Sequence, residues 1–199
     1  ARLQLVPRLG RFFDRHPAVT VDLRLSDRFV DLLDEGVDLA IRIGELGESG
    51  LVARRIGTMR RVTVARAHYW DARGRPERPE DLAGHDCIVF TGLSTGDVWE
   101  FEGPAGTIPV AVAGRLAVSS SDAMREAVLA GLGVGVTPLW MWRDELAAGA
   151  VEPVLSAFEP TPRPIQAVFP EGRLVSGKVR AMVEFLAEEF RREPSLSPP

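Results

Sequence analysis

The chain has 199 residues, of which 45% are hydrophobic and 26% charged, and this composition suits either one globular domain or two small lobes. Its formal net charge of −4 and pI of about 5.5 argue against a domain that itself binds nucleic acid. A single cysteine, Cys87, excludes an internal disulfide framework, and His16, His68 and His85 lack the spacing of metal ligands. We therefore expect no metal site and no cofactor. No apolar run approaches the ~20 residues that span a bilayer, so no membrane contact is expected.

Hydrophobic periodicity predicts helices and strands along the chain. In the first third of the chain, it predicts a helix ending before His16-Pro17, a half-exposed strand at 19–25, a short helix at 29–33 and a strand at 37–43 closed by Gly44. It then predicts a β-prone region at 51–67 broken at Gly57, a helical turn at 79–82 and strands at 87–91, 98–102 and 107–113. Towards the C-terminus, it predicts a short helix after Pro138, a strand at 165–169 and a final helix at 179–190.

Residues 114–138 combine a strand, a serine-rich turn, an amphipathic helix, a glycine stop and a second strand. Ser119 and Asp122 have the spacing of a capping box. Free backbone N–H groups and the positive end of the helix dipole favour a carboxylate or another anion at such a turn. Serines at a helix start are also common as simple caps, so capping and binding both remain open.

Strands that alternate with helices predict an α/β fold with mostly parallel pairing. Two strand–helix–strand units, at 19–43 and 114–137, could each anchor one lobe. The β-prone stretches at 62–66 and 165–169 would then carry the chain between the lobes twice. Ligands of α/β proteins favour the carboxyl ends of strands and clefts between domains, so we expect a ligand there.

A series of motifs runs from residue 3 to residue 190: Phe12-Phe13, His16-Pro17, Asp31 to Gly44, Leu51 to Gly57, Arg61 to Ala65, Pro79 to Leu82, His85 to Cys87, Trp99 to Phe101, residues 114–138 and Ser176 to Arg180 with Phe185-Leu186. Each is weak alone. Their order and spacing resemble the effector-binding (substrate-binding) domain of LysR-type transcriptional regulators.

The resemblance implies an α/β fold of two Rossmann-like lobes joined by two crossover strands, similar to type II periplasmic binding proteins. Lobe I would comprise residues 1–65 and 169–199, and lobe II residues 66–168. The polar, proline-rich end at 193–199 predicts a disordered tail. Relative to the family pattern, the chain lacks the N-terminal helix-turn-helix and the first strand of the effector domain, and we expect the neighbours of that strand to expose unpaired backbone groups.

By the same resemblance, a small effector would bind between the lobes. The expected effector-binding residues are Ser26, Arg28, Gly44, Glu45, Leu46, Ala65, Arg66, Phe90, Thr91, Ser119, Ser120, Ser121, Pro138 and Phe169. A cluster of arginines would favour an anionic effector if some of them face the cleft, and surface ion pairs are the alternative. This cluster comprises Arg42, Arg54, Arg55, Arg60, Arg61 and Arg66.

The sequence thus predicts the ligand-sensing and dimerisation domain of a cytoplasmic bacterial transcription regulator. It would form a homodimer through the first helix and the segment at 19–25, with a tetramer open for the full-length protein, and it would reach DNA only through an N-terminal domain. An exported solute-binding protein of the same fold is the alternative. Catalysis is not expected, because no nucleophile, base or metal accompanies Glu100 and Glu102 or Asp22 and Asp27.

Overall fold

The computed structural model describes residues 1–26, 36–45, 51–92, 95–170 and 176–197. It divides into two compact units, unit 1 (Ala1–Met59 and Pro162–Pro199) and unit 2 (Arg60–Thr161). The sequence prediction placed these boundaries at 65/66 and 168/169, several residues further along. The difference arises because β3 (Arg61–Arg66) pairs within unit 2, whereas all of β10 (Arg163–Pro170) pairs within unit 1.

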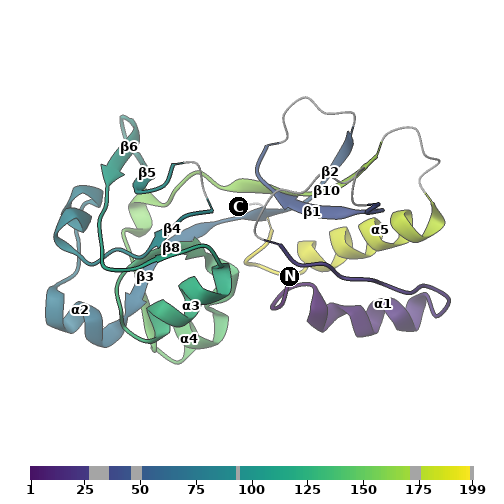
Figure 1. Ribbon diagram of the computed structural model, residues 1–199, viewed down its shortest axis with the longest axis horizontal. Helices are drawn as coiled ribbons and strands as arrows, with labels where there is room; N and C mark the ends of the chain where they lie inside the picture. Colours follow the sequence, from purple (N-terminus) through teal and green to yellow (C-terminus); the bar gives the residue numbers. More distant parts are fainter. Residues whose placement is uncertain (27–35, 46–50, 93–94, 171–175, 198–199) are drawn as a thin grey trace. The chain divides into compact units, whose positions relative to one another are not determined.

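Unit 1 is a three-stranded antiparallel sheet of order β1-β10-β2, with α5 between this sheet and α1 (Figure 1). The Phe12 ring of α1 is fully buried and meets the Phe185 ring of α5 at 5.3 Å between centroids. The elements besides β10 are η1 (Val6–Arg8), α1 (Leu9–Arg15), β1 (Ala40–Ile43), β2 (Leu51–Met59) and α5 (Gly177–Arg191). The first and last helices therefore lie close to where the sequence predicts them.

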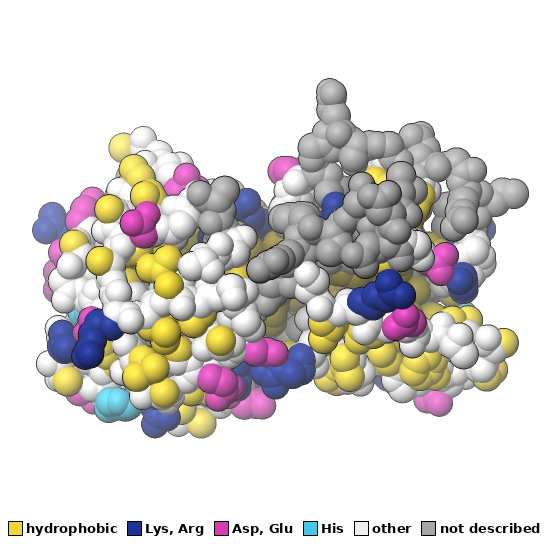
Figure 2. All heavy atoms as spheres, viewed as in Figure 1, with side chains coloured by type: hydrophobic (Ala, Val, Ile, Leu, Met, Phe, Trp, Pro, Cys, Tyr) yellow, Lys and Arg dark blue, Asp and Glu magenta, His cyan; other side chains and the backbone are white. Residues whose placement is uncertain are grey.

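A buried carboxylate joins the two helices of unit 1. Glu189 on α5 is 3% exposed and forms ion pairs with Arg8 and Arg11, which belong to η1 and α1. Burying a charge is tolerated only when it is paired, so this pairing fixes α1 against α5. Apolar side chains also reach the surface of this part of unit 1, where Val6 and Phe13 are exposed (Figure 2).

The described part of the C-terminal segment packs against unit 1, whereas the sequence predicts a disordered tail at 193–199. Leu196 is 1% exposed, and its backbone carbonyl accepts a hydrogen bond of 2.8 Å from the N–H of Thr58 in β2. Glu193 pairs with Arg8 at 3.1 Å. The composition of the segment is polar, but one leucine with a place in the core is enough to hold it.

The predicted strand at 19–25 is also absent. Val19 and Val21 are half-buried while Thr20 and Asp22 are exposed, so burial alternates over these four residues, but Leu23 and Leu25 are both exposed. However, no strand pairing that the structure describes includes these residues, and β1 is paired with β10 alone among the described residues. Alternation without a hydrogen-bonded neighbour does not make a strand. The predicted helix at 29–33 lies outside the described residues.

Unit 2 contains sheets of order β8-β3-β9, β4-β7 and β5-β6 (Figure 1). Its core gathers Trp70, Leu82, Phe101 and Val134, all fully buried. The elements besides β3 are α2 (Ala67–Arg73), η2 (Pro79–Gly84), β4 (Val89–Phe90), β5 (Val98–Gly103), β6 (Gly106–Ala111), β7 (Ala117–Val118), α3 (Ser121–Leu129), β8 (Gly135–Pro138), η3 (Leu139–Met141), α4 (Arg143–Ala147), β9 (Val151–Val154) and η4 (Ser156–Phe158).

The expectation of mostly parallel pairing was wrong. Strands β3 and β10 each begin just after the chain has passed from one unit to the other. Each of them runs antiparallel to the strands on either side of it. In the described part of the chain, parallel pairing is confined to β4 with β7 and to a bridge between Cys87 and Val134. The alternation of strands and helices in the sequence predicted the connections within a unit. It did not predict that β3 and β10 run antiparallel to their neighbours.

The β-prone region at 51–67 breaks at Arg60 rather than at Gly57. Gly57 lies inside β2, where a Cβ atom would stand 3.1 Å from the carbonyl oxygen of Leu196 and 3.3 Å from the Phe190 ring. The glycine is thus required by the close approach of the C-terminal segment and not by a turn. In the described ranges, no helix has the length and apolar character needed to cross a membrane.

Candidate functional site

The carboxyl ends of three parallel strands meet at one edge of unit 2. Strand β4 runs parallel to β7, and the bridge from Cys87 to Val134 sets it parallel to the chain entering β8. Thr91, Ser119 and Pro138 stand at these three ends, and the Thr91 N–H donates to the Val118 carbonyl at 2.8 Å. Such edges are where α/β proteins bind ligands.

The serine turn leads directly from β7 into α3. Ser120 is the N-cap, because its Oγ accepts a 3.5 Å hydrogen bond from the N–H of Ala123. The sequence had assigned this role to Ser119, one residue earlier. Ser119 is exposed and Ser121 is half-buried. The turn therefore presents hydroxyl groups and the positive end of a nine-residue helix at the edge of the sheet.

Arg125 holds the segment after Pro138 against α3. Its Nε donates to the Met141 carbonyl at 3.3 Å, its guanidinium lies 5.7 Å from the Trp142 ring centroid, and it pairs with Glu145. The serine turn and the Pro138 segment are thereby fixed to one helix, which favours a preformed binding edge.

In unit 1, Gly44 ends β1 at the edge where β10 begins. It is buried, with a φ of 107°, a conformation that other residues rarely adopt. Its N–H donates to the Pro164 carbonyl at 2.9 Å, and its own carbonyl accepts from Gln166 Nε2 at 2.8 Å. Arg163 Nη1 lies 3.9 Å from the point where a Cβ on Gly44 would stand. Glu45 follows and is exposed.

Three of the predicted residues lie away from these edges. Ala65 is fully buried in the core of unit 2, and Arg66 donates to the Leu129 carbonyl at the far end of α3 from the serine turn. Phe169 is near the end of β10, opposite Val52, whereas Gly44 is beside the beginning of that strand. The sequence places these residues on the predicted crossover stretches at 62–66 and 165–169, but the chain passes between the units at 59/60 and 161/162.

Of the remaining predicted effector-binding residues, two lie within the described ranges and two lie outside them. Phe90 is half-buried at the end of β4, beside Thr91, and Ser26 is exposed at the end of the first described range. Arg28 and Leu46 lie outside the described residues. Gln166 and Arg163 were missed by sequence reasoning, because they come next to Gly44 only through the pairing of Ile43 with Ile165.

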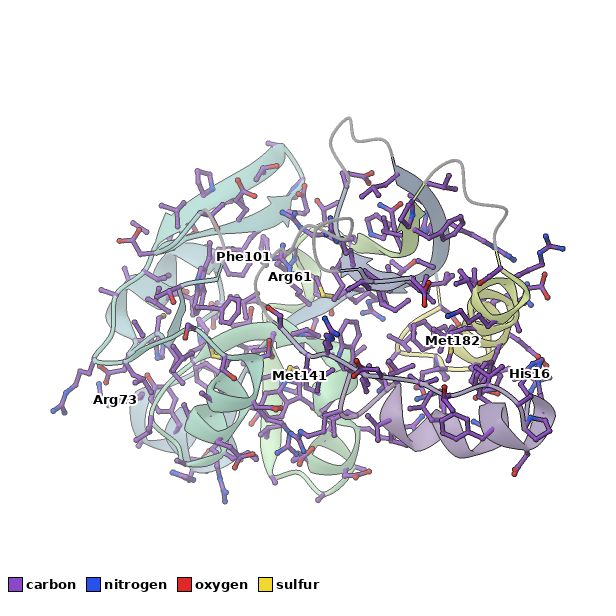
Figure 3. All side chains as sticks on the ribbon, turned by 45° about the vertical axis from the view of Figure 1, so that its right-hand side comes forward. His16, Arg61, Arg73, Phe101, Met141 and Met182 are labelled. Atoms are coloured by element: carbon purple, nitrogen blue, oxygen red, sulfur yellow. The ribbon has the colours of Figure 1, made fainter. Side chains whose placement is uncertain are left out.

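The arginine cluster has several separate roles. Arg60 forms a bidentate pair with Glu159 at 2.9 to 3.2 Å, and Arg55 donates to Thr58 Oγ1 at 2.8 Å. Arg61, labelled in Figure 3, begins β3 opposite Pro138 and so stands at the edge of unit 2 where β8 ends. The sequence grouped these residues as one cluster, whereas the fold distributes them.

No catalytic arrangement is found among the described residues. Glu102 accepts hydrogen bonds from two threonines, and Asp22 pairs with Arg24, while no group of three or more His, Cys, Asp or Glu in the described ranges could hold a metal ion. Burial raises the pKa of the Cys87 thiol to about 12, which makes it a poor nucleophile. Burial likewise lowers the pKa of His85, whose ring packs against Tyr69 and Trp70.

Comparison with known proteins identifies the family of the chain. A family model described as the LysR substrate binding domain matches residues 1–191. The chain is 34% identical over 189 residues to the HTH-type transcriptional regulator YhjC of Escherichia coli, covering 94% of this chain and 63% of that protein. It is 30% identical over 187 residues to the HTH-type transcriptional regulator CrgA of Neisseria meningitidis, covering 94% and 62% respectively. The chain thus spans a little over three fifths of these relatives.

A solved structure, the regulatory domain of CrgA from Neisseria meningitidis, superposes with a TM-score of 0.85 at 29% identity, covering 94% of this chain and 92% of that one. The α/β fold of the type II periplasmic-binding-protein kind, predicted from the sequence, is confirmed by this match together with the family model. The relatives named above are transcriptional regulators, and they lend no support to an exported solute-binding protein.

Proposed function

Because the chain belongs to the family of LysR substrate-binding domains, we propose that it senses a small-molecule effector on behalf of a transcriptional regulator. The observation that carries this proposal is the convergence of Thr91, the serine turn and Pro138 at the carboxyl ends of three parallel strands. Polar groups fixed at such an edge bind small polar ligands.

The proposed effector contacts in unit 2 are Phe90, Thr91, Ser119, Ser120, Ser121 and Pro138. In unit 1 they are Ser26, Arg28, Gly44, Glu45 and Leu46, of which Arg28 and Leu46 rest on the sequence alone. Ala65, Arg66 and Phe169 are not among the proposed contacts, because Ala65 and Arg66 lie at the other end of β3 from the edge of unit 2, and Phe169 lies at the other end of β10 from the edge of unit 1.

We further propose that the domain acts in the cytoplasm, without catalysis, and that it forms a homodimer. The exposed apolar side chains of Phe13 and of Leu25, which is 60% exposed, support an interface on unit 1. Contact with DNA would belong to another part of the full-length regulator. A mass above the monomer by light scattering would support the dimer, and a monomer at every protein concentration would refute it.

The effector is sought by native mass spectrometry of the purified protein, followed by a thermal-shift screen of small metabolites. A ligand at 100 times its Kd stabilises the native state by about 2.7 kcal/mol, a readily measured shift. Thr91→Val should raise the Kd of the ligand found by about three- to tenfold, the value of one hydrogen bond.

Thr107→Val is the matched control. Thr107 is also an exposed threonine of unit 2, but it lies in the β5–β6 hairpin, where its Oγ1 donates to Glu102 at 3.4 Å. This variant should leave the Kd unchanged. Equal Kd values for Thr91→Val and the parent protein would contradict the proposed site.

A further inference from the structure

We propose that unit 1 contains a carboxylate-binding subsite, formed by the backbone N–H of Glu45 and the guanidinium of Arg163 and oriented by Gln166. This subsite deepens the proposed function, on which it rests, by naming the chemical class of the effector group that unit 1 receives. Its members lie on two segments, the end of β1 and the beginning of β10.

The peptide at Gly44 is held rigidly from both sides. Gln166 is 9% exposed, and its Nε2 donates to the Gly44 carbonyl at 2.8 Å, while the Gly44 N–H donates to the Pro164 carbonyl at 2.9 Å. The side chain of a buried glutamine is fixed by packing as well as by this bond. Gln166 therefore determines the direction of the Gly44 carbonyl.

The direction of that carbonyl sets the direction of the next N–H. The described peptide bonds are trans, and in a trans peptide the C=O and the following N–H point in opposite directions. Since the Gly44 carbonyl points toward Gln166, the Glu45 N–H points away from it. No acceptor for this N–H occurs among the residues that the structure describes, and Glu45 is exposed.

A cationic side chain lies beside Gly44, the residue that precedes this donor. Arg163 Nη1 is 3.9 Å from the point where a Cβ on Gly44 would stand, and the Arg163 residue is exposed. A guanidinium and an oriented backbone N–H together offer the charge and the paired donors that bind a carboxylate. The carboxylate of Glu45 itself would weaken this attraction without abolishing it, because exposed charges are screened by solvent.

A monoanion fits this site better than a phosphate dianion. The donors are one guanidinium and one N–H, and the neighbouring Glu45 charge opposes a second negative charge on the ligand. A carboxylate should therefore bind more tightly than phosphate, and a neutral amide of the same shape should bind least.

The test uses acetate as the probe and the amide signal of Glu45 in the 15N-labelled full chain as the readout. Acetate should shift this signal saturably, acetamide should not, and inorganic phosphate should bind more weakly than acetate. Arg163→Met and Gln166→Met should each raise the acetate Kd by tenfold or more, whereas Glu45→Gln should lower it. Arg54→Met is the matched control, since Arg54 is an exposed arginine on β2.

Arg163 is at the surface, so its replacement tests the subsite even if Gln166→Met does not fold. A Glu45 signal that acetate does not move, or an equal acetate Kd in Arg163→Met and the parent, would overturn the proposal, and tighter binding of phosphate would overturn the choice of carboxylate. The amides of Thr91 and Ser120 report separately on the proposed function. If the identified effector shifts these two amides but not that of Glu45, the carboxylate subsite fails and effector sensing stands.

Discussion

Replacing Leu196 by alanine tests whether the C-terminal segment belongs to the fold. The side chain is 1% exposed, and its own backbone carbonyl is bonded to β2. Truncating a fully buried leucine removes its burial and leaves a cavity, at a cost of about 2 to 5 kcal/mol. We expect Leu196→Ala to lower the free energy of unfolding of unit 1 by about 3 kcal/mol.

The assay can separate the two units, because all four tryptophans of the chain, Trp70, Trp99, Trp140 and Trp142, lie in unit 2. Tryptophan fluorescence in guanidinium therefore follows unit 2, while hydrogen exchange of amides in β2 and α5 follows unit 1. Leu196→Ala should accelerate exchange in both of these elements.

Val52→Ala is the control for the same unit, because Val52 on β2 is 39% exposed and its replacement should cost no more than about 1 kcal/mol. A cost for Leu196→Ala as small as that of Val52→Ala would refute the reasoning. It would restore the interpretation of residues 193–199 as a disordered tail.

Three further predictions concern buried or crowded positions. Cys87 should resist thiol reagents at pH 8 in the native protein and react after unfolding, since burial raises the pKa of its thiol to about 12. Rapid reaction of the native protein would contradict this burial. Burial lowers the pKa of His85 below its ordinary value of 6.5, so the folded state favours the neutral ring. The unfolding free energy of unit 2, measured by denaturation at a series of pH values, should therefore fall as the pH drops below 6.5. His85→Gln should make this dependence on pH weaker. Gly57→Ala should cost about 1 to 3 kcal/mol in chemical denaturation, since its Cβ would meet the Leu196 carbonyl at 3.1 Å. Gly10→Ala, in open space on α1, should instead stabilise by about 0.5 to 1 kcal/mol, and equal effects of the two alanines would show that crowding at Gly57 is not decisive.

Local patterns in the sequence predicted the elements whose signal is carried by neighbours in the chain. Helix α5, strand β3 and the strand–turn–helix–strand order from β7 to β8 all appear close to the expected residues, although β3 is buried on both faces where the sequence alternates. The serine turn and its place after a strand followed from the same local reasoning, with the cap itself displaced by one residue. Each of these features depends on contacts within a few residues, which is why periodicity reveals them.

Predictions that depended on pairing partners failed more often. Residues 19–25 have the alternation of a strand but no described neighbour to bond with, and Leu196 has a polar, proline-rich context yet is buried. Gln166 and Arg163 carried no local signal for a binding role. They reach Gly44 because Ile43 pairs with Ile165, about 120 positions further along the chain.

By itself, the sequence determined the family, the α/β class and the position of the serine turn between a strand and a helix, since motif order and apolar periodicity can be read along the chain. Only the tertiary structure decided where the chain passes between the units, which strands run antiparallel and which side chains stand at the carboxyl edges. The physical reason is that backbone hydrogen bonds between distant strands set register and direction, and these bonds leave little trace in the local sequence.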